Sequence, residues 1–117
     1  SEASYAYTDI DTPTTDLLLV PEKLRKDKTV TAESTKQILS QVLDIIKKID
    51  EKDFNTVETI KSQIWDFAEK EGRGIVLWPL RIALTNKEKS FDPFTTLWIL
   101  GKEKAIQRIE KAVQALQ

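Results

Sequence analysis

From Thr31 onward, apolar positions recur every three or four residues, and capping residues and glycines interrupt them. The spacing predicts one helix that starts after Thr31, a good N-cap residue, with lysines and aspartates on its polar side. A second helix is expected from Asn55, because Asn55 and Glu58 form an approximate capping box. Gly72 is expected to end that helix in a positive-φ conformation.

The rest of the chain predicts three further helices. Residues 72–78 (GRGIVLW) are expected to form a turn and a short extended run, and Pro79 then takes the first position of a helix that ends at Asn86. Asp92 and Pro93 are the N-cap and first-turn proline of the next helix. Gly101 precedes a last amphipathic helix, whose apolar stripe comprises Ala105, Ile106, Ile109, Ala112, Val113 and Leu116.

The first 28 residues lack a helical period and are interrupted by Pro13 and Pro21. We therefore expect residues 1–28 to be an irregular lead-in from an upstream domain, with a short helical turn from Pro21 to Arg25. Residues 29–117 are expected to form the helical domain. With about five helices and no convincing strand, the predicted fold is all-α, a compact helical cage.

Composition excludes several kinds of site. The chain has 117 residues with no cysteine, histidine or methionine, so disulfides, thiolate sites and imidazole ligands or bases are absent. The acidic positions Asp9, Asp11 and Asp16 lack the glycine and glutamate of a calcium loop, so no metal site is expected. No apolar stretch is long enough to span a membrane, and we expect a cytoplasmic protein. Because Met is missing at position 1, we expect the chain to be part of a longer protein.

Candidate chemistry lies between Arg81 and Lys104. Although the net charge is −1, this run has five cations against three anions. Arg81 offers a planar donor fork, and the loop residues Ser90, Phe91 and Pro93 offer a hydroxyl, an aromatic plane and a fixed turn. Such groups suit unpaired nucleic-acid bases. The basic residues that could contact phosphates are Lys87, Lys89, Lys102 and Lys104.

Alternatives stay open for these residues on pattern alone. In the alternative interpretation, Arg81 forms an ion pair with a carboxylate and Phe91 folds back into the core. The tryptophans lie on or beside apolar stripes, where packing is favoured over base binding; they are Trp65, Trp78 and Trp98. A different class of function is a helical protein–protein interaction module that presents its Trp- and Ile-rich stripes to a partner helix.

Two segments resemble a known family. LWPLRIALTNKEKS (77–90) and LGKEKAIQRIEKA (100–112) are similar, in order and spacing, to the C-terminal anticodon-binding region of bacterial-type glutamyl-tRNA synthetases. The resemblance implies that Arg81 contacts an anticodon base and that Ser90, Phe91 and Pro93 line the pocket of a neighbouring base. Two positions depart from the family pattern: Asn86 replaces a glycine, and Phe91 stands where proline is commoner.

The resemblance also implies a larger enzyme. The intact protein would be a glutamate–tRNA ligase, a class I aminoacyl-tRNA synthetase of translation that uses ATP and Mg. The HIGH and KMSKS-like motifs of its catalytic domain are absent from this chain. The chain by itself is therefore expected to be non-catalytic and without a cofactor, and to bind the anticodon stem-loop of a tRNA as a monomer.

Overall fold

The computed structural model describes residues 9–117, and every regular element in that range is helical. The predicted all-α fold is confirmed, with six α-helices in place of about five. Two short 3₁₀ helices, η2 and η3, accompany them. In chain order the elements are α1 (Thr15–Leu18), η2 (Glu22–Leu24), α2 (Ala32–Lys48), η3 (Glu51–Phe54), α3 (Val57–Glu71), α4 (Arg73–Thr85), α5 (Pro93–Leu100) and α6 (Lys102–Ala115).

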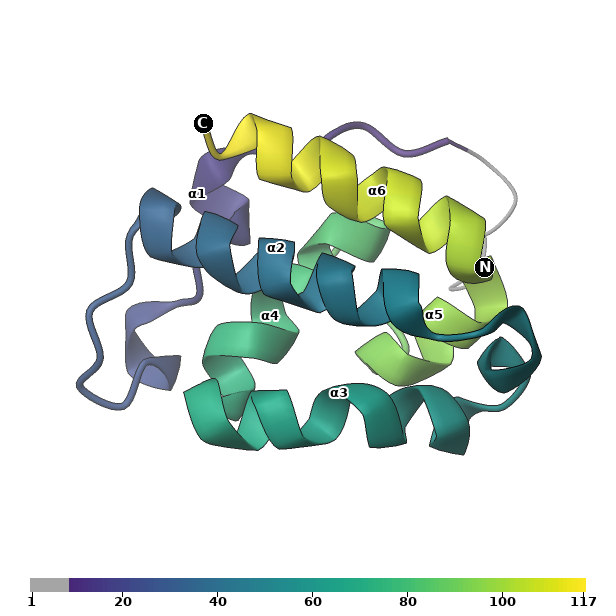
Figure 1. Ribbon diagram of the computed structural model, residues 1–117. Helices are drawn as coiled ribbons and strands as arrows, with labels where there is room; N and C mark the ends of the chain where they lie inside the picture. The colour runs from purple at the N-terminus through teal and green to yellow at the C-terminus, as the bar shows by residue number, and fades with distance from the viewer. Residues whose placement is uncertain (1–8) are drawn as a thin grey trace.

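Helix α4 is the centre of the molecule. Helices α2 and α6 lie side by side and run in opposite directions, α3 lies on the other side, and α4 crosses between them (Figure 1). Each of the other five α-helices contacts α4. Most of its side chains are consequently buried: Val76, Pro79, Leu80, Ile82, Ala83, Leu84 and Thr85.

The prediction for the start of α4 was wrong. The helix begins at Arg73, so the expected turn and extended run are helical, and Pro79 lies inside the helix rather than at its first position. An internal proline costs the hydrogen bond to the carbonyl four residues earlier, here Ile75. Burial of seven of its 13 residues outweighs that cost. A helix that is apolar nearly all round has no amphipathic period, which is why the sequence suggested a strand.

The start of α3 was also predicted one residue too early. The N-cap is Thr56, whose hydroxyl accepts a hydrogen bond from the backbone N–H of Thr59 at 3.1 Å, while Asn55 ends η3. The other predicted boundaries are confirmed, because each has the geometry its residue favours. These are the N-caps Thr31 and Asp92 and the helix-ending residues Gly72, Asn86 and Gly101.

The described part of the lead-in packs on the helical body. The short helical turn expected within 21–25 is present as η2, and α1 is an additional helix. Leu18 is fully buried against the core. The indole N–H of Trp78 donates to the carbonyl of Leu17 at 2.9 Å, and the hydroxyl of Thr15 donates to the carbonyl of Ala115 at 3.1 Å. Residues 15–18 are thereby fixed to α4 and to the end of α6, and the boundary at residue 28 stays a prediction.

The described residues also limit other kinds of site. Within 9–117, no group of three or more acidic side chains is placed to hold a metal ion. None of the helices in this range combines the length and the apolar character needed to cross a membrane.

Candidate nucleic-acid interface

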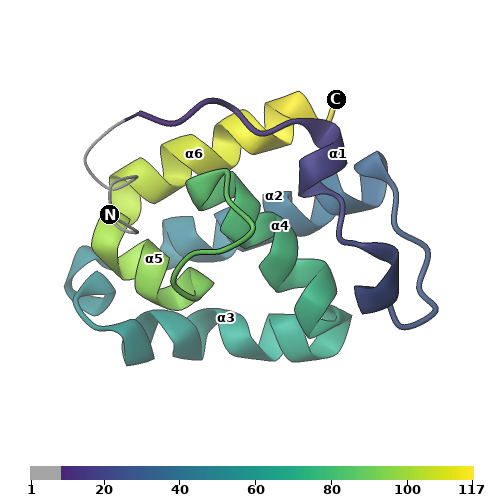
Figure 2. The same ribbon diagram turned by 180° about the vertical axis from the view of Figure 1, so that it is seen from behind.

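The end of α4 turns the chain so that the following loop returns toward Arg81. Asn86 adopts the left-handed conformation (φ 56°) and its N–H bonds to the carbonyl of Ile82 at 2.7 Å. The Thr85 hydroxyl lies 2.9 Å from the carbonyl of Arg81 and accepts from the N–H of Lys87 at 3.1 Å. The loop between α4 and α5 lies on the side of the molecule away from α2 (Figure 2).

The guanidinium of Arg81 has few partners. Its Nη1 donates to the backbone carbonyl of Glu88 at 3.3 Å, and its Nε is buried without a hydrogen-bond partner. Among the described carboxylates, none forms an ion pair with Arg81. The described residues therefore do not support the alternative that Arg81 forms an ion pair with a carboxylate.

Asp92 fixes the far end of the loop. One carboxylate oxygen accepts the N–H groups of Phe94 and Thr95 at 3.0 and 3.1 Å, and the other accepts the Thr95 hydroxyl at 2.7 Å. Partial burial acts to raise the pKa of Asp92, but the hydrogen bonds from Thr95 and Phe94 and the charge of Arg81 outweigh it and hold that pKa below its ordinary value. The carboxylate is therefore negative at neutral pH and interacts electrostatically with the guanidinium of Arg81.

The predicted base-contacting residues meet at this loop, although they differ in exposure. Phe91 is 38% exposed, so the alternative that it folds into the core is wrong. Ser90 is partly exposed, and its hydroxyl donates to the carbonyl of Phe91 at 3.0 Å. Pro93 is buried as the first residue of α5. The structure thus brings Arg81 to the loop that carries Ser90 and Phe91, whereas Pro93 serves mainly to open the helix.

The four predicted phosphate-contacting lysines separate into two pairs. Lys87 and Lys89 are exposed on the loop beside Arg81. Lys102 instead directs its ammonium to the carbonyls of Lys47, at 3.0 Å, and Ile49, at the C-terminal end of α2. A phosphate contact by Lys102 would have to compete with these two bonds.

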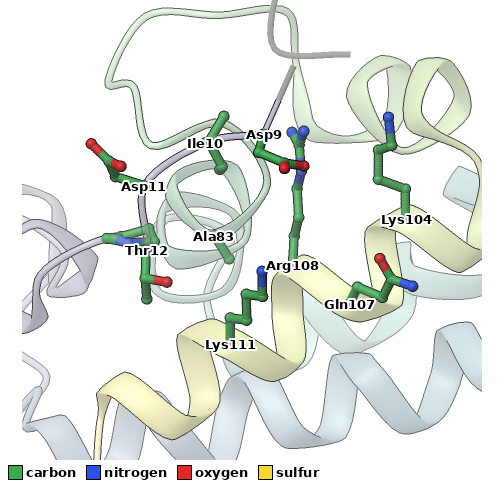
Figure 3. A pocket seen from close by; sticks show the side chains of 10 residues that line it. Asp9, Ile10, Asp11, Thr12, Ala83, Lys104, Gln107, Arg108 and Lys111 are labelled. Atoms are coloured by element: carbon green, nitrogen blue, oxygen red, sulfur yellow. The ribbon is translucent and has the colours of Figure 1, made fainter. Parts of the chain in front are cut away.

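Lys104, the fourth lysine, lines a pocket away from the loop. Side chains from α6 and from the lead-in enclose a pocket of about 50 Å³, in which Lys104, Arg108 and Lys111 rise toward the segment that carries Asp9 and Asp11 (Figure 3). Both charges surround this pocket, and the loop also carries both, since Lys87 and Lys89 are exposed there together with Glu88 and Asp92.

Arg108 is a structural residue that the sequence reasoning did not single out. It is only 7% exposed, and its Nη1 donates to the carbonyl of Leu84 at 2.7 Å, near the C-terminal end of α4. A cation at that place satisfies a helix-end carbonyl and interacts favourably with the helix dipole. Its position in the sequence could have indicated burial, because Arg108 falls within the apolar stripe of α6 between Ala105 and Ala112.

The three tryptophans do not behave alike. Trp65 packs edge-to-face on Phe94, with ring centroids 6.1 Å apart, and Trp78 packs on the core with its N–H bonded to the lead-in. The packing interpretation is confirmed for these two. It is wrong for Trp98, which is 48% exposed and lies outside the core, with its indole N–H donating to the carbonyl of Asn55 at 3.0 Å.

Comparison with protein families gives a match over nearly the whole chain. A family model described as an anticodon binding domain matches residues 7–113. The matched range includes Arg81, the loop after it and all six α-helices except the last residues of α6.

Curated relatives point in the same direction. The chain is 36% identical over 92 residues to the glutamate–tRNA ligase of Clostridium botulinum, an alignment that covers 74% of this chain and 18% of the ligase. It is 30% identical over 118 residues to the glutamate–tRNA ligase of Francisella philomiragia, covering 98% of this chain and 23% of that protein. The Flavobacterium johnsoniae ligase is 30% identical over 84 residues, with 72% and 17% covered. The chain thus spans about a fifth of the length of these relatives.

Proposed function

The chain belongs to the anticodon-binding domain family, in the form related to bacterial glutamate–tRNA ligases, and on that premise we propose that it binds a tRNA anticodon loop through Arg81 and residues 88–93. The observation that carries the proposal is the state of Arg81. Its Nε is buried without a partner, and its one hydrogen bond goes to a loop carbonyl at 3.3 Å. Nη2 makes no hydrogen bond to the described residues, so its donors remain for a ligand that accepts from this partly exposed guanidinium.

Arg81 and Phe91 offer the two kinds of contact that unpaired bases need. A guanidinium can donate two parallel hydrogen bonds to the edge of a base, and an aromatic ring can stack on its face. Bases in an anticodon loop are unpaired, so both their edges and their faces are accessible. We propose that Arg81 reads a base edge, while Ser90 and Phe91 contact a neighbouring base and the buried Pro93 holds the turn that places them.

The loop is held stiffly enough to present these groups. Thr85 and Asn86 fix its start, and the cap formed by Asp92 fixes its end. A binding site that is already ordered loses less conformational entropy when a ligand binds. The exposed Lys87 and Lys89 are placed on this same loop, and we propose that they contact RNA phosphates.

The activity of the larger protein is a separate proposal. The relatives are glutamate–tRNA ligases, of which this chain spans about a fifth. We propose that the chain is the anticodon-binding part of such a ligase, and that the ATP- and Mg-dependent attachment of glutamate to tRNA takes place in other domains. In this proposal residues 29–117 form the recognition domain, and the protein works as a cytoplasmic monomer.

Binding of a labelled anticodon stem-loop hairpin of a glutamate tRNA, followed by fluorescence anisotropy, tests the proposal. Arg81→Ala is expected to weaken binding by about 1–3 kcal/mol, roughly 5- to 150-fold in Kd. Binding should also weaken as salt is raised, because phosphate contacts release counterions.

The matched control is Lys48→Ala, which removes an exposed cation on α2. This control is expected to change Kd by less than about twofold, because a single solvated charge far from the contact contributes little. Equal losses for Arg81→Ala and Lys48→Ala would show that Arg81 does not read a base. Absence of hairpin binding by the unaltered chain would reject the proposed function as a whole.

A further inference from the structure

Two large aromatic rings are exposed at α5, that of Phe91 in the loop before the helix and that of Trp98 within it. Thr95 and Trp98 are three residues apart in α5, the spacing that places two side chains on one side of a helix. None of the three is buried, and Phe91 and Trp98 are 38% and 48% exposed. The opposite side of α5 packs into the core through Pro93, Phe94, Thr96 and Leu97.

The ring of Trp98 is held in place by a polar contact. Its indole N–H donates to the carbonyl of Asn55, in the turn between η3 and α3, at 3.0 Å. The one polar atom of the side chain is therefore already satisfied within the protein. What remains available to a ligand is the ring itself, which is the part that stacks on a base.

We propose that Trp98 is a second base-stacking platform, so that α5 and the loop before it take two unpaired bases of one RNA, one at Phe91 beside Arg81 and one at Trp98. This inference rests on the proposed function and extends its site along α5. Pro93, which follows the loop that carries Phe91, and Trp98 are five residues apart in α5, which is ~7.5 Å along the axis at 1.5 Å per residue. Stacked bases are only ~3.4 Å apart, so the two platforms suit bases that are splayed from each other.

The character of the surroundings favours RNA over a protein partner. Among the described residues, the exposed large hydrophobic side chains are Leu24, Phe91 and Trp98, and Trp98 has Thr95 and the Asn55 turn as neighbours. Isolated rings among polar groups do not make the contiguous surface of ~800 Å² per partner that a stable protein interface buries. A single ring is sufficient for a base, because every base has a flat π face.

The test compares Trp98→Ala with Trp98→Phe in binding the same anticodon stem-loop hairpin. Trp98→Ala is expected to weaken binding by about fivefold or more, the effect of losing one base–aromatic stack. Trp98→Phe also loses the bond to Asn55 but keeps an aromatic plane, so its Kd should stay within about twofold of the unaltered chain. Leu24→Ala, which removes an exposed apolar side chain elsewhere, should leave Kd unchanged.

A set of hairpins, each with one loop base removed, locates the base that stacks on Trp98. For one of these abasic hairpins, the difference between Trp98→Ala and the unaltered chain should disappear, because the stacking partner is gone. Circular dichroism melts of each variant establish that the protein is folded at the assay temperature.

Three results would overturn the inference. Unchanged affinity of Trp98→Ala, together with weakened binding by Arg81→Ala, would reject the Trp98 platform and leave the proposed function intact. Equal losses for Trp98→Phe and Trp98→Ala would assign the effect to the Asn55 hydrogen bond rather than to stacking. If the RNA-free chain self-associates in sedimentation and Trp98→Ala disperses it without changing RNA affinity, the ring is a protein contact.

Discussion

Arg81 and Arg108 lie on neighbouring helices, but the structure treats them in opposite ways. Arg108 is almost completely buried and donates to the carbonyl of Leu84 at 2.7 Å. Arg81 is half-buried, reaches the carbonyl of Glu88 at 3.3 Å, and leaves its Nε unpaired. The difference teaches that the hydrogen-bond partners of a cation, more than its place in the sequence, separate a stabilising role from the recognition role that we propose for Arg81.

The end of a helix explains why cations become structural. The last carbonyls of a helix lack backbone donors and carry the negative end of the helix dipole. Arg108 supplies a donor near the end of α4, and Lys102 does so at the end of α2. Arg81 instead contacts a carbonyl in a loop. Exchanging this hydrogen bond for one to a ligand costs less stability than removing a donor from a helix end.

Removal of the Arg108 guanidinium is expected to have the largest effect on stability. Arg108→Met keeps most of the apolar stem but leaves the Leu84 carbonyl without this donor in a buried place. We expect the free energy of unfolding to fall by about 2–3 kcal/mol, the range for losing a buried hydrogen bond to a charged group. Urea denaturation followed by circular dichroism measures it. A loss below about 1 kcal/mol would mean that Arg108 is not a structural cap, and the contrast with Arg81 would break.

Local chemistry made most helix boundaries predictable. Thr31, Asp92 and Asn86 act through atoms of their own or of residues within four positions, so the sequence contains all that is needed to place them. The start of α4 was not predictable in this way. Its conformation depends on burial against five other helices, and that burial also overrides the helix-breaking tendency of Pro79.

In the candidate site too, some features follow from the local sequence and others from packing between distant segments. The approach of the loop to Arg81 follows from the turn at Thr85 and Asn86, which the sequence partly indicated. Lys102 could not be separated from Lys87 by sequence, because its partner carbonyls lie in α2, which is distant in the chain. The exposure of Trp98 likewise depends on how α5 packs against α3, which no local pattern specifies.

Asp92 sharpens the comparison through pH, because its carboxylate connects the cap of α5 with the charge of Arg81. Its pKa is lowered in the folded state from an ordinary value of 3.8. A lowered pKa means that its contribution to stability is complete above pH 3.8 and is lost as the pH falls through the lower folded-state value. Asp92→Asn keeps an equally good cap but does not titrate, so at neutral pH it should cost less than about 1 kcal/mol.

Urea denaturation at a series of pH values between 2 and 6 tests this. The unaltered chain should lose more stability than Asp92→Asn as the pH falls below 3.8, with the two curves parallel above about pH 5. Parallel curves through the whole range would show that Asp92 has no special interaction in the folded state.

The smallest expected effect on stability belongs to Arg81, although its expected effect on RNA binding is large. Arg81→Met removes one weak hydrogen bond, but it also removes a buried N–H that has no partner. Because these two contributions oppose each other, the free energy of unfolding should change by no more than about 0.5 kcal/mol. The same urea titration used for Arg108→Met measures it. A loss comparable with that of Arg108→Met would mean that Arg81 also stabilises the fold, and its loss of RNA binding could then be attributed to a disordered loop rather than to a missing base contact.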